Sequence, residues 1–168
     1  EKKLFAERMN SDVEFCKFTI LKNWAALQYV KEENQTEEIC KLAIEQCTRA
    51  LQYVVNQTEE ICEYTLEYRC EPIQLNQAPY VITKDERTLR AFACIKKEFQ
   101  TEKICEIAVK QCWKALEFVK MEFQTEEICK LAIKKNIKAF EFIKAECKTE
   151  EVCKFLEECE SKIYKSRR

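Results

Sequence analysis

The sequence predicts an all-α protein, arranged as a right-handed α-solenoid of about seven short helix pairs with a capping helix at each end. A phrase of the form Gln-Thr-Glu-x-Ile-Cys recurs along the chain. The 168 residues include no glycine and two prolines, and 46% of them are hydrophobic. Recurrence every 20–50 residues, roughly, is typical of stacked repeats, whereas the turns between strands depend on glycine for their backbone angles. Together these observations favour helices joined by short connections.

The recurring phrase divides the chain into units. Near copies begin at Gln35, Gln57, Gln100 and Gln124, and weaker copies begin at Asp12 and Lys148. A degenerate copy begins at Gln77, where Ala-Pro-Tyr follows instead of Thr-Glu-Glu. We therefore expect one repeat domain over residues 1–168, with units at 12–35, 36–57, 58–77, 78–100 (degenerate), 101–124, 125–148 and 149–168. A helix over Glu1–Met9 is expected to cover the first unit, and the last unit lacks a second helix, as suits a terminal cap.

Each unit is expected to contain two short helices. Thr36 is a favourable N-cap, since its hydroxyl can accept a hydrogen bond from an otherwise unpaired backbone N–H. Glu37 and Glu38 then lie at the positive end of the helix dipole. Apolar residues recur at helical spacing over residues 39–47, and a second apolar stretch over residues 50–54 predicts the second helix.

These phrases resemble a tandem repeat family of unknown function, with units of about 24 residues, which is abundant in giant DNA viruses of amoebae and found in some bacteria. The resemblance spans residues 12 to about 160 and implies a helical array of viral origin, with no activity established for the family. The family often carries Asn-Gly between its paired helices. Here these places hold Asn23-Trp24, Cys47-Thr48, Cys112-Trp113 and Asn136-Ile137, so the turn must form without glycine.

Twelve cysteines allow three interpretations with chemical consequences: a secreted disulfide scaffold, a metal site and a reactive thiol. Stacked helices lie about 8–10 Å apart, which is too far for a disulfide. The chain has no histidine, which removes a common zinc ligand and the usual base for a thiol nucleophile. We therefore favour buried free thiols that fill space between helices. The expected core column is Cys16, Cys40, Cys62, Cys105, Cys129 and Cys153, and the thiols expected to be accessible are Cys94, Cys112, Cys147 and Cys159.

Composition narrows the range of functions. The net charge of −1, with Lys and Glu interleaved, gives no overall attraction for nucleic acid or an anionic membrane. No apolar run approaches the ~18 residues of a membrane span, and a chain without glycine has no Gly-rich phosphate loop. We therefore expect no cofactor, no metal, no membrane and no enzymatic activity. Free thiols imply a reducing, intracellular compartment: the host cytoplasm, the nucleus or the virion.

Aromatic residues are one group of candidates for binding a partner. Trp24 and Trp113 occupy equivalent places after the turn between paired helices. They are either exposed anchors for a partner or, as such residues more often are, plugs in the core. The aromatic column at Tyr29, Tyr53, Phe118 and Phe142 has the spacing of core residues, and we assign it to packing.

Polar residues form two further groups. Lys134, Lys135 and Lys138, with Lys130 nearby, make a basic surface near the C-terminal end, for which a solvated helix face is the simpler explanation. Residues 71–90 depart most from the repeat, and there Gln74, Asn76 and Gln77 stand between two prolines. This stretch is either a kink in the array or a loop that a partner recognises, and the kink is the simpler interpretation.

The sequence thus predicts a non-enzymatic helical-repeat protein that offers a protein-interaction or structural surface to a host or viral protein. The alternative is a nucleic-acid-associated factor that uses the basic C-terminal end. A thiol redox or metal-binding protein is the weaker alternative.

Overall fold

The computed structural model describes residues 2–68 and 83–166, and every regular element in these ranges is helical. The prediction of an all-α protein is confirmed for this part of the chain. The α-helices are α1 (Lys2–Ser11), α2 (Val13–Lys22), α3 (Glu37–Gln46), α4 (Glu59–Glu67), α5 (Lys84–Cys94), α6 (Glu102–Gln111), α7 (Glu126–Lys135) and α8 (Glu150–Ser166). The 3₁₀-helices are η1 (Trp24–Tyr29), η2 (Glu32–Asn34), η3 (Thr48–Tyr53), η4 (Lys97–Phe99), η5 (Trp113–Phe118), η6 (Met121–Phe123), η7 (Ile137–Phe142) and η8 (Ala145–Cys147).

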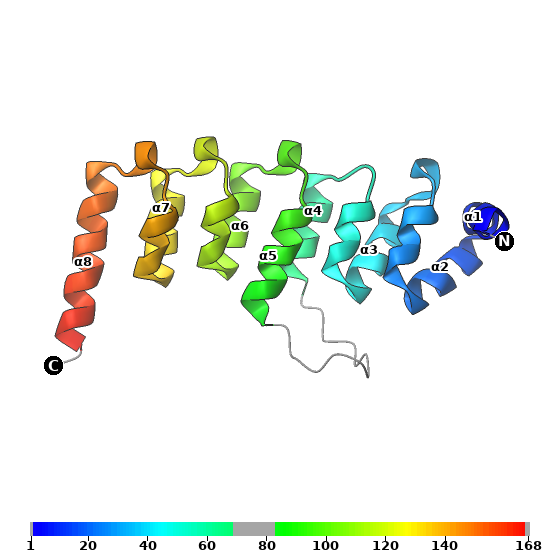
Figure 1. The fold of residues 1–168 in the computed structure, drawn as a ribbon, viewed down its shortest axis with the longest axis horizontal. Helices are drawn as coiled ribbons and strands as arrows, with labels where there is room; N and C mark the ends of the chain where they lie inside the picture. Colours follow the sequence, from blue (N-terminus) through cyan, green and yellow to red (C-terminus); the bar gives the residue numbers. More distant parts are fainter. Residues whose placement is uncertain (1, 69–82, 167–168) are drawn as a thin grey trace. The chain divides into compact units, whose positions relative to one another are not determined.

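The chain divides into two compact units, Glu1–Thr83 with Cys94–Phe99, and Lys84–Ala93 with Gln100–Arg168. Within the first unit α2 packs on α3, and within the second α6, α7 and α8 pack in chain order (Figure 1). The longer 3₁₀-helices also pack on one another, η1 on η3 and η5 on η7. One repeat is therefore an α-helix followed by a 3₁₀-helix, and both halves contact the next repeat.

The threonine of each phrase starts an α-helix, as predicted. The Thr36 hydroxyl accepts a hydrogen bond from the backbone N–H of Ile39 at 3.4 Å, and the same bond recurs at Thr58, Thr101, Thr125 and Thr149. Glutamates follow in the first turn of the helix, where their charge complements the helix dipole. The predicted N-caps are confirmed.

The second helix predicted for each unit is a 3₁₀-helix of six residues. One extended residue separates it from the preceding α-helix; Cys47, for example, has φ −162° and ψ 124°. Any residue adopts extended backbone, so the turn needs no glycine, and no residue in the described chain has a positive φ. Runs of 3₁₀-helix this long are uncommon. Packing stabilises them here, since Ala50 and Leu51 of η3 are fully buried.

A buried glutamine forms hydrogen bonds that connect the six-residue 3₁₀-helices of two neighbouring repeats. The Gln124 amide nitrogen donates to the carbonyl of Val119, just after η5, at 3.3 Å and to the carbonyl of Phe142, at the end of η7, at 3.4 Å. Its amide oxygen accepts from the backbone N–H of Lys144 at 2.8 Å. Gln35 makes the same set of bonds in the first unit. We call a glutamine with these bonds a clamp glutamine.

Gln57 is a clamp glutamine whose partners lie farther along the chain. Its amide nitrogen donates to the carbonyl of Cys94 at 3.0 Å, and its oxygen accepts from the backbone N–H of Lys96 at 2.9 Å. The carbonyl lies 37 residues after Gln57, whereas the equivalent separation for Gln35 and Gln124 is 18. Gln57 therefore bonds to residues about one repeat farther along the chain than those reached by Gln35 and Gln124.

A helix stands at each end of the described chain. The helix predicted at Glu1–Met9 is found as α1, in which Met9 is buried. The ring of Phe5 packs edge-on against Phe15 and Tyr29, with centroids 5.9 and 5.6 Å apart. At the other end α8 is one helix of 17 residues, longer than the 10 residues of α6 and α7.

The cysteine column lies largely in the core. Five of its six members are buried, and the last, Cys153, is half-buried: the buried thiols are Cys16, Cys40, Cys62, Cys105 and Cys129. The prediction that Cys112 is accessible is wrong, because this extended residue after α6 turns its side chain inward and is 1% exposed. Cys94, Cys147 and Cys159 are half-buried.

Candidate functional site

Each tryptophan packs between the six-residue 3₁₀-helices of two neighbouring repeats. Trp24 begins η1 and stacks on Tyr53 of η3, with ring centroids 6.0 Å apart. Trp113 begins η5 and packs on Phe142 of η7 at 5.8 Å. Each indole is half-buried, and a cation lies over each ring, Arg49 over Trp24 and Lys114 over Trp113, so packing accounts for these residues.

The aromatic column assigned to packing is divided between the core and the surface. Tyr53 and Phe142 pack beneath the tryptophans and are half-buried. Tyr29 and Phe118, at the same place in η1 and η5, are 44% and 50% exposed. Tyr53 and Phe142 thus pack between repeats, Tyr29 packs against the ring of Phe5 but stays partly exposed, and Phe118 forms part of the surface.

The predicted basic surface lies where α7 ends and η7 begins. Lys134, Lys135 and Lys138 are exposed there, and the first two occupy the last turn of α7, where cations complement the helix dipole. Lys130, one turn earlier, bonds to Glu126, and this hydrogen bond raises the pKa of the lysine. Within the described ranges no carboxylate pairs with the other three lysines.

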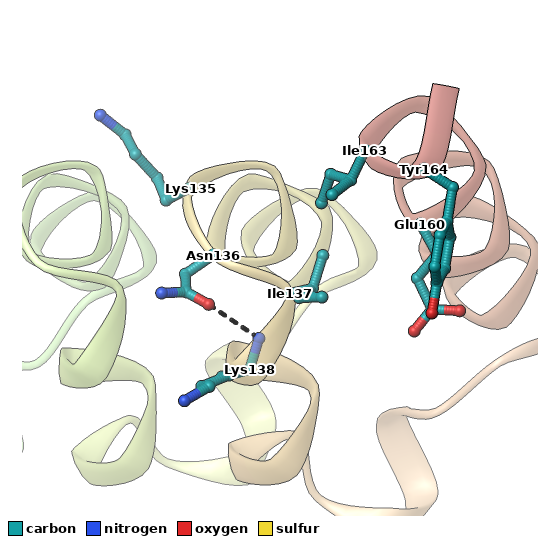
Figure 2. A pocket seen from close by; sticks show the side chains of 7 residues that line it. All are labelled: Lys135, Asn136, Ile137, Lys138, Glu160, Ile163 and Tyr164. Atoms are coloured by element: carbon teal, nitrogen blue, oxygen red, sulfur yellow. Dashed lines mark hydrogen bonds between the residues drawn. The ribbon is translucent and has the colours of Figure 1, made fainter. Parts of the chain in front are cut away.

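Lys135 and Lys138 also line an open groove of about 410 Å³, which we call the C-terminal groove (Figure 2). Figure 2 shows Ile137 of η7 and Ile163 of α8 facing one another across it. The two lysine side chains extend on the α7 side, away from α8. The groove therefore has an apolar floor, and its α7 wall carries two lysines whose ammonium groups point outward from that floor.

The opposite wall of the C-terminal groove is formed by α8. It contributes Glu160 and Tyr164, and the tyrosine is 74% exposed. Asn136 completes the lining: its Oδ1 accepts from the backbone N–H of Lys138 at 3.0 Å and so caps the start of η7.

The C-terminal groove occupies the place where another 3₁₀-helix would pack if the repeat continued. One repeat earlier, Trp113 at the start of η5 packs on Phe142 of η7. Ile137 holds the same place at the start of η7, but α8 runs on for 17 residues, and no 3₁₀-helix follows it in the described chain. Ile137 and Ile163 consequently remain half-buried.

A second groove, of about 520 Å³, lies between α2 and α3, and we call it the N-terminal groove. Phe18 exposes 60% of its surface there. The lysines of this groove are paired: Lys17 lies 2.8 Å from Glu38, and Lys41 lies 2.5 Å from Glu37. The hydrogen bond to Glu38 raises the pKa of Lys17. The positive charges of both lysines in the N-terminal groove are thus compensated by glutamates of the same chain.

The buried thiols are chemically quiet. Burial raises the pKa of Cys40 and Cys62 to about 11, and that of Cys105 and Cys129 to about 12. These thiols stay protonated at neutral pH and pack as small apolar groups. In the described part of the chain no cluster of His, Cys, Asp and Glu is arranged to hold a metal ion, and no helix is long and apolar enough to cross a bilayer.

Sequence reasoning found only part of the C-terminal groove. It singled out Lys135 and Lys138 but missed the apolar floor and the α8 wall. One signal was available in residues 149–166: they carry no second apolar stretch like that of residues 50–54, which would give Ile137 the contact that Trp113 makes. The predicted candidates Gln74, Asn76 and Gln77 lie outside the described residues.

Comparison with known proteins gives one match. The model of a family described as a domain of unknown function, DUF4116, matches residues 101–148. This stretch holds two consecutive repeats, which begin at the N-caps Thr101 and Thr125. No curated protein and no solved structure matches the chain. The chain is therefore similar to this family over two of its repeats, and the family's description assigns it no activity.

Proposed function

We propose that this chain is a non-enzymatic helical-repeat protein that binds a protein partner through side chains presented by its 3₁₀-helices. The observation that carries the proposal is the exposure of Tyr29 and Phe118 at equivalent places in η1 and η5. Aromatic side chains supply large contact area at a small entropic cost and are enriched at the centres of protein interfaces. Both stand on helices tied to their neighbours by clamp glutamines, so the helix that carries each ring is held in place before a partner arrives.

The residues beside these aromatic side chains differ in charge. Gln28 precedes Tyr29 in η1, whereas Glu117 precedes Phe118 in η5, and Lys114 is exposed on the same helix. Equivalent places in the two repeats thus present different chemistry on the same frame. Such variation supports a surface that recognises a specific partner rather than one that only fills space.

An α-solenoid is the arrangement that we propose for the whole chain. This proposal is supported by packing within each unit, where consecutive α-helices pack on one another and so do the six-residue 3₁₀-helices of neighbouring repeats. The buried free thiols suit a reducing compartment, so an intracellular location is part of the proposal. A viral origin rests on the resemblance of the repeated phrase alone.

Quantitative affinity capture from a lysate of the source cell tests the proposed function. We expect Tyr29→Ser with Phe118→Ser to reduce the recovered partner by about fivefold or more, because both exposed rings are lost. The matched control is Leu4→Ser with Val13→Ser, which removes apolar groups that are 71% and 58% exposed on α1 and α2. Thermal unfolding would verify that each variant folds, and Phe118→Ser alone serves if the pair does not. Equal recovery by wild type and both variants would contradict the proposal.

A further inference from the structure

We propose that the C-terminal groove binds a short acidic segment of a protein partner, with an aromatic side chain against Ile137 and Ile163 and carboxylates beside Lys135 and Lys138. This inference rests on the proposed function, because it names the partner's chemistry at one surface. It adds a binding site that lies apart from the exposed rings of η1 and η5.

The preceding repeat indicates what fits the floor of the groove. There the first residue of η5, Trp113, contacts the ring of Phe142, the last residue of η7 in the next repeat, with ring centroids 5.8 Å apart. Trp24 makes the same kind of contact with Tyr53 in the first unit. Ile137 holds this place in η7 and faces Ile163 across an open groove. The volume of about 410 Å³ is within the range of small binding pockets and accommodates an aromatic side chain with part of its backbone.

The charges of the C-terminal groove indicate which residues of the partner would stand beside its aromatic side chain. The α-helices α3 and α6 end in Gln46 and Gln111, whereas α7, like α2, ends in a lysine, Lys135. No carboxylate pairs with Lys135 or Lys138 anywhere in the described chain. The one carboxylate among the lining residues is Glu160, on the opposite wall (Figure 2). An acidic segment along the α7 wall therefore supplies the missing complement.

The same charges disfavour two other occupants. A second copy could offer the exposed Leu4 of α1, which is 71% exposed, but Lys3 and Arg8 on that helix would face the lysines of the groove. A nucleic acid would contact the lysines through phosphates, yet it would meet Glu160 and would leave the floor unfilled. An acidic peptide with one aromatic residue uses the lysines of the α7 wall and the floor together.

Fluorescence anisotropy with defined probes tests the assignment. The first probe is a fluorescein-labelled peptide of sequence Ser-Asp-Glu-Trp-Asp-Glu-Ser. Its counterparts carry Ala in place of Trp, or Lys in place of the four acidic residues, and a short labelled DNA duplex is the last probe. At about 0.15 M salt we expect saturable binding of the first peptide, with about tenfold weaker binding of each counterpart. Lack of saturable binding by the first peptide would overturn the proposal, as would preferential binding of the duplex.

Matched variants locate the binding. Lys135→Glu with Lys138→Glu should weaken binding of the first peptide by about tenfold or more. Lys134→Glu with Lys144→Glu makes the same charge change at exposed residues outside the groove and should weaken it by less than about twofold. Equal losses in the two pairs would mean that bulk charge drives binding and would overturn the assignment.

A third variant and the capture experiment complete the test. Tyr164→Ala removes the exposed ring of the α8 wall and should weaken binding about threefold without affecting folding, since the side chain is 74% exposed. An unchanged affinity would count against the α8 wall as part of the site. If the peptide fails to bind while the Tyr29 and Phe118 variants still lose the partner, this inference fails and the proposed function stands.

Discussion

The N-terminal and C-terminal grooves both expose apolar side chains beside lysines, but they differ in how the lysines are compensated. In the N-terminal groove Lys17 lies 2.8 Å from Glu38. In the C-terminal groove the described chain offers no carboxylate partner to Lys135 or Lys138. Both grooves therefore expose apolar surface. Only the C-terminal groove has lysines without a carboxylate partner in the described chain, and this difference makes it the candidate site.

The two grooves also differ in how they are built. Two packed α-helices, α2 and α3, form the N-terminal groove. In the C-terminal groove one wall is the 3₁₀-helix η7, whose last residue is bonded to the clamp glutamine Gln124. The shape of the C-terminal groove thus depends on this buried side chain as well as on the packing of α7, η7 and α8, whereas that of the N-terminal groove depends on the packing of α2 and α3.

Removing the clamp glutamine should give the largest effect. We expect Gln124→Ala to lower the free energy of unfolding by about 3 kcal/mol, because backbone groups at Phe142 and Lys144 lose their buried partner. Urea unfolding measures this. Gln28→Ala is the control, since Gln28 is exposed and donates only to the carbonyl of Ala25 among the described residues, and it should cost less than about 0.5 kcal/mol. Similar costs for the two variants would show that the C-terminal groove does not depend on the clamp.

A pH titration should give the next largest effect and would show whether the halves of the chain differ in the core as well. Burial raises the pKa of Cys40 to about 11 and that of Cys129 to about 12, from an unfolded value of 9.0. The unfolded state therefore loses these protons first, so stability is complete below pH 9.0 and falls as the pH rises towards the folded pKa. At about pH 10 each thiol should cost about 1 kcal/mol.

Urea unfolding between about pH 8 and about pH 10 measures this loss. Cys40→Ala and Cys129→Ala should reduce the pH dependence by similar amounts, because both thiols are buried in the same column. If only one variant reduces the pH dependence of the free energy of unfolding, the cores of the two halves differ. The two halves would then differ in their cores as well as in their grooves.

Transferring the charge pattern should give the smallest effect. Glu14→Lys with Glu38→Lys removes two acidic residues from the N-terminal groove and releases Lys17. We expect this variant to gain severalfold in affinity for the acidic aromatic peptide, measured by anisotropy. Glu7→Lys with Glu33→Lys, outside that groove, is the control for net charge. No gain over the control would mean that charge does not explain the difference between the grooves.

Local features of the fold were predictable from the sequence. The N-cap of Thr36 depends on one side chain and the three residues after it, and the burial of Cys105 depends on helical spacing within one turn. The prediction for Cys112 is wrong because it treats a residue outside the core column as accessible, whereas the extended backbone after α6 turns this side chain inward. The 3₁₀ geometry of η3 also escaped prediction, since its apolar spacing over six residues fits either helix type.

Features that join distant parts of the chain were not predictable in this way. A polar residue between two helices, such as Gln124, suggests a solvent-exposed connection, but its partners are backbone groups 18 and 20 residues farther on. The C-terminal groove likewise requires η7 and the end of α8 to lie together. The sequence identified Lys135 and Lys138 because their charge can be read from it. It did not identify Ile163, because the sequence does not show that Ile137 lies across the groove from it.

The joints between α-helix and 3₁₀-helix all use ordinary extended backbone, at Asn23, Cys47, Cys112 and Asn136. No joint depends on glycine, so the backbone conformation of a joint excludes only proline, although burial at Cys112 also limits the size of the side chain there. The residue after the joint already varies from an indole to a hydroxyl to a branched aliphatic group. Copies of the repeat can therefore diverge in the side chain that follows the joint while the backbone of the joint stays the same.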